Sequence, residues 1–187
     1  MGKVIALINI TADGFCDSQY VNANAEFHEF AHTLLAKTAN VGFGRSSFEL
    51  FQQVWPAVLE KEEQPESQVR MARALTDKSK LVFSQTLKDF TWRNSSIVKL
   101  ANPDMISRYK EATSGDLLTI GSPGLVASLT RQGLVDDYYF AVQPVIAGGG
   151  GVRLFDKLQL DTTQPLMFKE SKALGSGVVI NHYQRKS

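Results

Sequence analysis

A glycine junction between residues 116 and 133 has the spacing of a phosphate-binding site. Residues 116 to 120 form a mainly apolar strand that runs into Gly121, and Pro123 suits the first turn of the helix that follows. The N–H groups of residues 122 to 125 would have no partner within that helix, and such groups bind phosphates. The junction therefore predicts a nucleotide site, although glycine in many α/β loops only turns the chain.

Four consecutive glycines at residues 148 to 151 follow an apolar strand expected at residues 140 to 146. Such a run costs conformational entropy on folding, so it needs a local reason. Close approach to a ligand or to the Gly121 turn would be such a reason, and a flexible surface loop is the alternative.

Two further strand ends carry polar groups. Gly44, Arg45 and Ser46 stand where a strand meets a helix, and they combine an open backbone with a guanidinium and a hydroxyl. The tripeptide at residues 84 to 86 follows another apolar strand. Each group also has a simpler reading, as a surface charge, a helix cap or a turn. Three such strand ends together favour a ligand site, because ligands of open α/β sheets bind at the carboxyl ends of the strands.

The elements that would position these groups alternate along the chain. The patterns predict strands at residues 3–10, 40–44, 80–84, 97–100, 116–120 and 140–146, and a terminal antiparallel hairpin from 166–170 and 178–185. Helices are expected at residues 24–37, from residue 45, up to about residue 75, after residue 103, and at 122–133. Residues 55–68 look like an exposed excursion that could act as a lid. The sum is one α/β domain over residues 1–187, with a mainly parallel sheet covered by helices.

Composition excludes several classes of protein. The chain has 187 residues, 43% of them hydrophobic, and its 20 basic and 19 acidic side chains give a net charge of +1. Without a basic cluster, nucleic acid and anionic membranes are not expected partners. Cys16 is the only cysteine, which suits a cytoplasmic protein, and the apolar run at residues 4–8 is too short for a signal or membrane segment.

Residues 28 to 32 allow an alternative interpretation, a zinc site. His28, Glu29 and His32 satisfy the pattern H-E-x-x-H on a predicted helix, where two histidines one turn apart could bind zinc and the glutamate could activate its water. Glu49 and Glu60 are the nearest downstream carboxylates for a third ligand. The alternative is that the histidines are only a partly exposed flank of a packed helix, and we expect no metal.

Across nearly its whole length the chain resembles the dihydrofolate reductase superfamily, and most closely the riboflavin-biosynthesis reductase domain, the C-terminal half of bacterial RibD, with its stand-alone relatives. The resemblance rests on an ordered series of segments: residues 11–15 (TADGF), 27–30 (FHEF), 44–49 (GRSSFE), 81–84 (LVFS), 120–122 (IGS) and 133–136 (GLVD), continuing through Pro144 and Gly148.

The resemblance implies a three-layer α/β/α fold, an NADPH-dependent reductase and a homodimer. It also implies a role for each matching residue. The cofactor phosphates would contact Gly44, Arg45 and Ser46; the adenosine ribose and its 2′-phosphate would lie by Ser84, Gln85 and Thr86; the pyrophosphate would be held by Gly121, Ser122, Gly124, Leu125 and Val126; and the nicotinamide side would be lined by Ala6, Asn9 and Ile10.

The substrate is less defined. Residues 22 to 32 offer no clear match to the acid with which dihydrofolate reductases bind the pterin, so folate is not supported. The phosphoribosylamino pyrimidine of riboflavin synthesis would need a cationic pocket, for which the sequence shows no basic cluster. Asp13 is the best polar candidate for a catalytic or positioning residue, although Asp-Gly is also a common turn. A protein that binds a nucleotide or small ligand without turnover is the alternative function.

Overall fold

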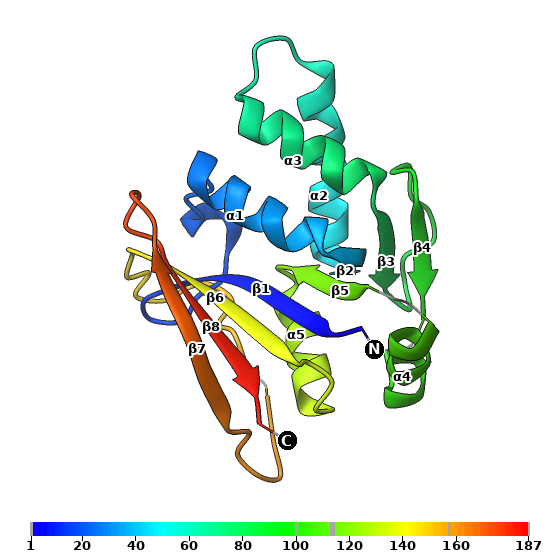
Figure 1. Cartoon of the computed structure of the whole chain (residues 1–187), viewed down its shortest axis with the longest axis vertical. Helices are drawn as coiled ribbons and strands as arrows, with labels where there is room; N and C mark the ends of the chain where they lie inside the picture. Colours follow the sequence, from blue (N-terminus) through cyan, green and yellow to red (C-terminus); the bar gives the residue numbers. More distant parts are fainter. Residues whose placement is uncertain (1, 100, 113–114, 157, 187) are drawn as a thin grey trace.

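One mixed sheet of eight strands forms the centre of the molecule (Figure 1). The computed structural model describes residues 2–99, 101–112, 115–156 and 158–186. The strands are β1 (Val4–Thr11), β2 (Thr38–Gly44), β3 (Ser79–Phe83), β4 (Ser95–Val98), β5 (Asp116–Ile120), β6 (Asp137–Gln143), β7 (Leu166–Ala173) and β8 (Val179–Arg185). Their order is β4-β3-β2-β5-β1-β6-β8-β7; the pairs from β4 to β6 are parallel, and β8 is antiparallel to both β6 and β7.

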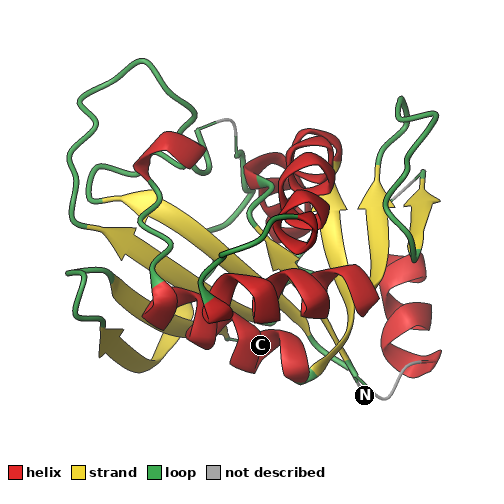
Figure 2. Ribbon diagram, turned by 90° about the horizontal axis from the view of Figure 1, so that it is seen from above, coloured by secondary structure: helices red, strands yellow, loops and turns green. Residues whose placement is uncertain are grey.

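Helices cover both faces of this sheet, as Figure 2 shows. They are α1 (Ala25–Ala36), α2 (Arg45–Glu60), α3 (Glu66–Asp77), α4 (Pro103–Ala112) and α5 (Pro123–Arg131), with a 3-10 turn η1 at Ser18–Tyr20. None of the helices in the described ranges combines the length and the apolar character needed to cross a membrane.

Alternation along β1 divides the core in two. Ile5 and Leu7 pack with α1, α2 and α3 on one face, whereas Val4, Ala6 and Ile8 pack with α4 and α5 on the other. Both faces are buried, as expected for a strand with parallel neighbours on each side. The predicted three-layer α/β/α fold with its C-terminal antiparallel hairpin is thereby confirmed.

The expected excursion at residues 55–68 is wrong over most of its length. Helix α2 continues to Glu60 although Pro56 lies inside it, and only residues 61–65 separate it from α3. Phe51 and Trp55 lie one helical turn apart and pack against the core. This apolar contact holds the helix together despite the backbone hydrogen bond that proline cannot donate.

Two strand ends also differ from the sequence prediction. β6 ends at Gln143 rather than at residue 146, because Pro144 has no N–H to donate to a neighbouring strand. β4 ends at Val98, and Leu100, the predicted end of that strand, lies outside the described residues.

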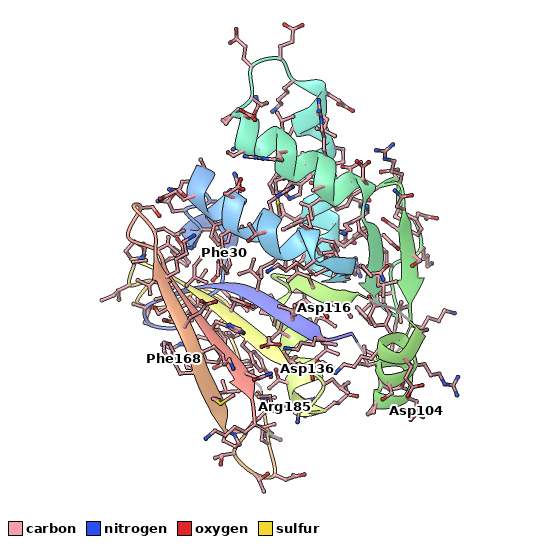
Figure 3. The ribbon with its side chains drawn as sticks, viewed as in Figure 1. Phe30, Asp104, Asp116, Asp136, Phe168 and Arg185 are labelled. Carbon is pink, nitrogen blue, oxygen red and sulfur yellow. The ribbon has the colours of Figure 1, made fainter. Side chains whose placement is uncertain are left out.

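Charged groups tie together the amino ends of the parallel strands. The Asp136 carboxylate accepts hydrogen bonds from the Val4 backbone N–H at 2.8 Å and from the Lys110 ammonium at 2.5 Å. The Arg185 guanidinium approaches the same carboxylate at 4.0 Å, and Figure 3 shows these two side chains close together. This edge is the opposite one from that at which α2 and α5 begin.

Lys80 is fully buried and closes the C-terminal end of α3. Its ammonium donates to the carbonyls of Leu75 at 2.9 Å, Thr76 at 3.1 Å and Lys78 at 2.8 Å, and it lies 4.5 Å from the centre of the Trp92 ring. These carbonyls have no partner within the helix. Burial lowers the pKa of the Lys80 side chain from 10.5 to about 8.

We expect Lys80→Met to lower the free energy of unfolding by about 1–3 kcal/mol at pH 7, because it removes the Lys80 donor from the Leu75 and Lys78 carbonyls. Urea denaturation measures this loss. The exposed Lys88 provides the control, and Lys88→Met should stay within about 0.5 kcal/mol of wild type.

Comparison of the wild type with Lys80→Met also tests the lowered pKa of Lys80. Between pH 8 and 10.5 the unfolded chain holds more protons at Lys80 than the folded chain, so the wild type should gain stability as the pH rises through this range. Lys80→Met cannot make that gain, and the stability gap should widen. A gap that is constant with pH would show that Lys80 titrates normally.

Candidate functional site

Two adjoining cavities open at the carboxyl ends of β1, β2, β3 and β5. The first has a volume of about 610 Å³ and the second of about 500 Å³. Both are bordered by Ser46 and Ser47 at the start of α2 and by Ser122 and Pro123 at the start of α5. A molecule in the first cavity would therefore touch a molecule in the second.

The start of two helices forms the wall of the first cavity. Gly44 precedes α2 and Ser122 precedes α5; Gly44 has no side chain that could cap α2, and the Ser122 side chain does not cap α5. The first turn of each helix contains no acidic residue that could bind its N–H groups. Two positive helix ends that meet at one cavity favour an anion such as a phosphate.

Ser122 fixes the two helix ends relative to each other. Its backbone is left-handed, with φ of 60° and ψ of 66°, and it follows Gly121, whose φ is 71°. The Ser122 Oγ accepts a hydrogen bond from the Gly44 N–H at 2.8 Å. Such a conformation costs energy for any residue other than glycine, and backbone strain of this kind concentrates at ligand sites.

Arg45 joins the turn after β3 to the wall of the first cavity. Its guanidinium donates through Nη1 to the Thr86 hydroxyl at 3.0 Å and through Nε to Glu49 at 2.9 Å. The Ser84 Oγ accepts from the N–H groups of Thr86 at 3.2 Å and Leu87 at 2.9 Å, which shapes the turn after β3. A cationic group thus bridges the start of α2 and this turn.

Most of the residues expected at a cofactor lie at these cavities. The first cavity is lined by Gly44, Arg45, Ser46, Ser84, Gln85, Ser122, Gly124 and Leu125. The second is lined by Asn9, Gly121 and again Ser46 and Ser122. Thr86 borders neither, but the hydrogen bond from Arg45 ties it to the first.

Besides Thr86, three expected cofactor residues line neither of the two cavities. Ala6 is 1% exposed and Val126 is 0% exposed, since both pack in the core between β1 and α5. Ile10 packs against the same core. The Val126 N–H donates to the Ser122 carbonyl at 3.0 Å, so it belongs to the helix and has no free hydrogen for a phosphate. The side chains of Ala6, Ile10 and Val126 thus pack in the core, and their expected contacts with a cofactor stay a prediction.

The Asp13 carboxylate accepts hydrogen bonds from its own loop and from the segment after β6. Its carboxylate accepts from the Thr11 hydroxyl at 2.6 Å and from the N–H groups of Ala147 at 3.0 Å and Gly148 at 2.8 Å. These donors lower its pKa from 3.8 to about 2, the Thr11 hydroxyl most of all. A carboxylate with so low a pKa is a poor proton donor or acceptor near neutral pH, so the geometry favours positioning over catalysis.

The glycine run lies against the loop that contains Asp13. Gly148, Gly149 and Gly150 have positive φ values of 77°, 148° and 80°. A Cβ at Gly151 would lie 2.1 Å from Asp17 Oδ2, which itself accepts from the Val152 N–H at 2.9 Å. Positive φ thus accounts for glycine at residues 148–150, and close approach to residues 15–17, rather than to the Gly121 turn, accounts for Gly151.

The second cavity is mainly apolar. Its walls include Phe27, Phe51 and Trp55, and His28 lies among them at 5% exposure. Asn9 adds a polar group beside the cavity, and its Oδ1 accepts from the buried Gln143 Nε2 at 2.8 Å. The cavity can therefore enclose an aromatic molecule while offering it a few hydrogen bonds.

The zinc alternative finds no support in the geometry. Glu29 pairs with Arg70 at 2.9 Å, and His32 borders a different surface hollow from the one that His28 faces. Among the described residues, no group of three or more His, Cys, Asp or Glu side chains is arranged to hold a metal ion.

Sequence reasoning missed several residues of the site. Lys99 and Ser128 line the first cavity, and no local pattern distinguished them from ordinary surface residues. Phe51 and Trp55 line the second cavity, and their spacing of one helical turn was a usable signal. Gln143, a polar residue at the end of an apolar strand, was another.

A family model identifies the chain. The model of the RibD C-terminal domain matches residues 3–180. The chain belongs to this family. The uncharacterized protein YyaP of Bacillus subtilis strain 168 is 25% identical over 187 residues, which cover 95% of this chain and 92% of that protein.

Solved structures show the same fold. A protein from Shewanella sp. PV-4 attributed to riboflavin biosynthesis matches with a TM-score of 0.71 at 18% identity, over 99% of each chain. Dihydrofolate reductase from Enterococcus faecalis, complexed with NADP(H) and RAB-propyl, matches with a TM-score of 0.63 at 12% identity, over 100% of this chain and 98% of that one. The RibD C-terminal domain thus shares the α/β architecture of dihydrofolate reductase.

We expect Asp13→Ala to release the glycine run from its neighbouring loop. Hydrogen exchange followed by NMR should then be faster at the amides of Ala147 and Gly148, which lose their acceptor. Asp17→Ala is the matched control, because it removes the acceptor of Val152 alone. In the wild type, the stabilisation that the Asp13 carboxylate provides should be complete above about pH 4 and lost as the pH falls through 2. The reason is that the pKa of Asp13 is lower in the folded protein than in the unfolded chain. Unchanged exchange in Asp13→Ala would contradict the positioning role.

Proposed function

We propose that this RibD C-terminal domain is an NADPH-dependent reductase. The observation that carries the proposal is that two uncapped helix starts meet at one cavity, which opens directly into a second, apolar cavity. The first cavity suits the phosphates of a dinucleotide, and the second suits the molecule to be reduced.

The residues present fit the cofactor. The N–H groups at the starts of α2 and α5 would hold its phosphates, and Arg45 and Lys99 would supply positive charge beside them. Bound NADPH would supply a hydride to an electrophilic carbon of the substrate, with a proton from solvent completing the reduction. The dihydrofolate reductase neighbour complexed with NADP(H) supports this choice of cofactor.

The protein itself would orient the two molecules and exclude water. Ser122 and Pro123 border both cavities, so they define where the two ligands meet. The apolar walls of the second cavity remove solvent from the reacting atoms. Asn9, held by Gln143, would position the polar part of the substrate.

A single substitution at Gly124 tests the phosphate site. Gly124 lies in the first turn of α5, at the cavity, and a Cβ there has no atom within 4 Å. Gly124→Asp should weaken NADPH binding by about 1–4 kcal/mol, because it places a negative charge beside the phosphates. An acidic residue in a first helical turn stabilises the helix, so a folding defect is not expected.

Gly124→Asn is the matched control for Gly124→Asp. It has nearly the same shape without the charge, so isothermal titration calorimetry should find NADPH affinity close to wild type. Equal affinities for the aspartate and asparagine variants would remove the helix start from the cofactor site.

Arg45→Ala tests the cationic bridge to Thr86. We expect NADPH affinity to fall by about 1–3 kcal/mol, the range for a charge-assisted hydrogen bond, and NADH affinity to fall less if Arg45 reaches the 2′-phosphate. The exposed Arg73 on α3 serves as the control substitution. Calorimetric titration with both dinucleotides measures the difference, and unchanged NADPH affinity would exclude Arg45 from the site.

A binding protein without turnover is the second candidate function. It would bind NADPH equally well, so binding alone cannot separate the two functions. The discriminating measurement is the decrease of NADPH absorbance when carbonyl or imine compounds are added. The riboflavin-pathway pyrimidine is the first physiological compound to compare.

A homodimer is a further part of the proposal. The outermost strand β7 exposes Met167 and Phe168, at 40% and 57%, as Figure 3 shows for Phe168. We propose that a second copy of the chain covers them. Light scattering should then give about twice the chain mass of 20.7 kDa, and Phe168→Glu should reduce it to that of one chain.

A further inference from the structure

The second cavity is lined without a single charged residue among those that the structure describes. Its polar groups are hydroxyls, the Asn9 amide, the Cys16 thiol and the His28 imidazole, and the rest of its wall is apolar. The cations near the site, Arg45 and Lys99, line the first cavity instead. A reductase that acts on a sugar phosphate would need a cation here to offset the buried charge.

From this lining we infer that the second cavity takes an uncharged, planar, mainly apolar substrate without a phosphate group, and that His28 recognises its polar atom. This inference rests on the proposed reductase function and names the class of molecule that would be reduced. It separates the chain from reductases of phosphorylated pyrimidines.

His28 is the polar group most in need of a ligand. The Nδ1 atom is buried and has no hydrogen-bond partner among the described residues. A buried imidazole with an unpaired nitrogen is destabilising, and because His28 lines the second cavity, a ligand there can offer its ring a hydrogen bond. A neutral imidazole has one donor and one acceptor, so it can bind a hydroxyl, a carbonyl or a ring nitrogen.

The surroundings of His28 keep it uncharged and oriented. Burial lowers its pKa below the usual value of 6.5, so the ring is neutral at physiological pH and offers no cation to a phosphate. Its ring meets Trp55 edge to face at a centroid distance of 5.8 Å, and Trp55 lies 6.0 Å from Phe51. Aromatic walls of this kind suit a flat ring system.

The nearest acidic side chains are also accounted for. The carboxylates of Asp13 and Asp17 accept backbone hydrogen bonds from Ala147 and Val152 in the segment after β6, and Glu29 pairs with Arg70. None of these side chains lines the second cavity. A cationic substrate, like a phosphorylated one, would therefore find no partner of opposite charge.

A matched set of small probes tests the inference. Calorimetric titration of the NADPH-loaded protein with 1-naphthol, 1-naphthyl phosphate and naphthalene varies only the group on one flat ring system. We expect 1-naphthol to bind at least tenfold more tightly than the phosphate, and about fivefold to tenfold more tightly than naphthalene, the range of one hydrogen bond. Equal or tighter binding of the phosphate, or binding of no probe, would overturn the substrate class.

The variant His28→Phe tests the recognition of the polar atom. It keeps an aromatic ring against Trp55, so the core stays filled, but it removes both ring nitrogens. The preference for 1-naphthol over naphthalene should disappear in His28→Phe and persist in the control His32→Phe, whose side chain borders another hollow. A preference that persists in His28→Phe would remove His28 from substrate recognition.

These experiments test the reductase function and the substrate class independently, so that either can be refuted without the other. Titration with NADPH alone tests the first cavity and the reductase function, whereas the probe series repeated without NADPH tests the second cavity. This repeat uses the variant Gly124→Asp, so that 1-naphthyl phosphate is repelled from the empty first cavity. Gly124 does not line the second cavity. Loss of NADPH binding with probe selectivity intact would refute the reductase and leave the ligand class standing.

Discussion

Parallel pairing of β2 with β5 is the constraint on which the site depends. It brings Gly44 and Ser122, which are distant in sequence, close enough for a hydrogen bond of 2.8 Å. Each strand is followed at once by a helix, so the same pairing sets two helix starts side by side. Gly44 lies close to Ser122, since a Cβ added to it would lie 3.4 Å from that of Ser122, within van der Waals contact.

The two cavities divide the chemistry between backbone and side chains. The first cavity offers the N–H groups of two helix starts and two cationic side chains. These groups suit a phosphate. The second offers aromatic walls and few polar atoms, and in the proposed function its selectivity would come from shape, from lack of charge and from His28. A fold shared with dihydrofolate reductase can in this way act on a different class of molecule, because substrate choice resides in the side chains of one cavity.

Two acidic residues hold the loops beside the cavities, and neither has a catalytic role in the proposed reduction. Asp13 binds the start of the glycine run and Asp17 binds its end, and these two contacts join the segment after β1 to the segment after β6. The Cys16 N–H donates to the Val152 carbonyl at 2.9 Å between them. Such pairing gives a defined wall to a region whose composition alone suggests a flexible loop.

The sequence by itself determined the α/β class, the mainly parallel sheet, the terminal hairpin and the strand ends at Gly44, Ser84 and Gly121, because periodicity and glycine placement are local properties. It also determined that Pro123 begins a helix. Only the tertiary structure decided that Val126 is buried in the core, that Asp13 binds the glycine run, and that His28 faces an uncharged cavity while Glu29 pairs with Arg70. These outcomes depend on contacts between residues distant in the chain, which no local pattern encodes.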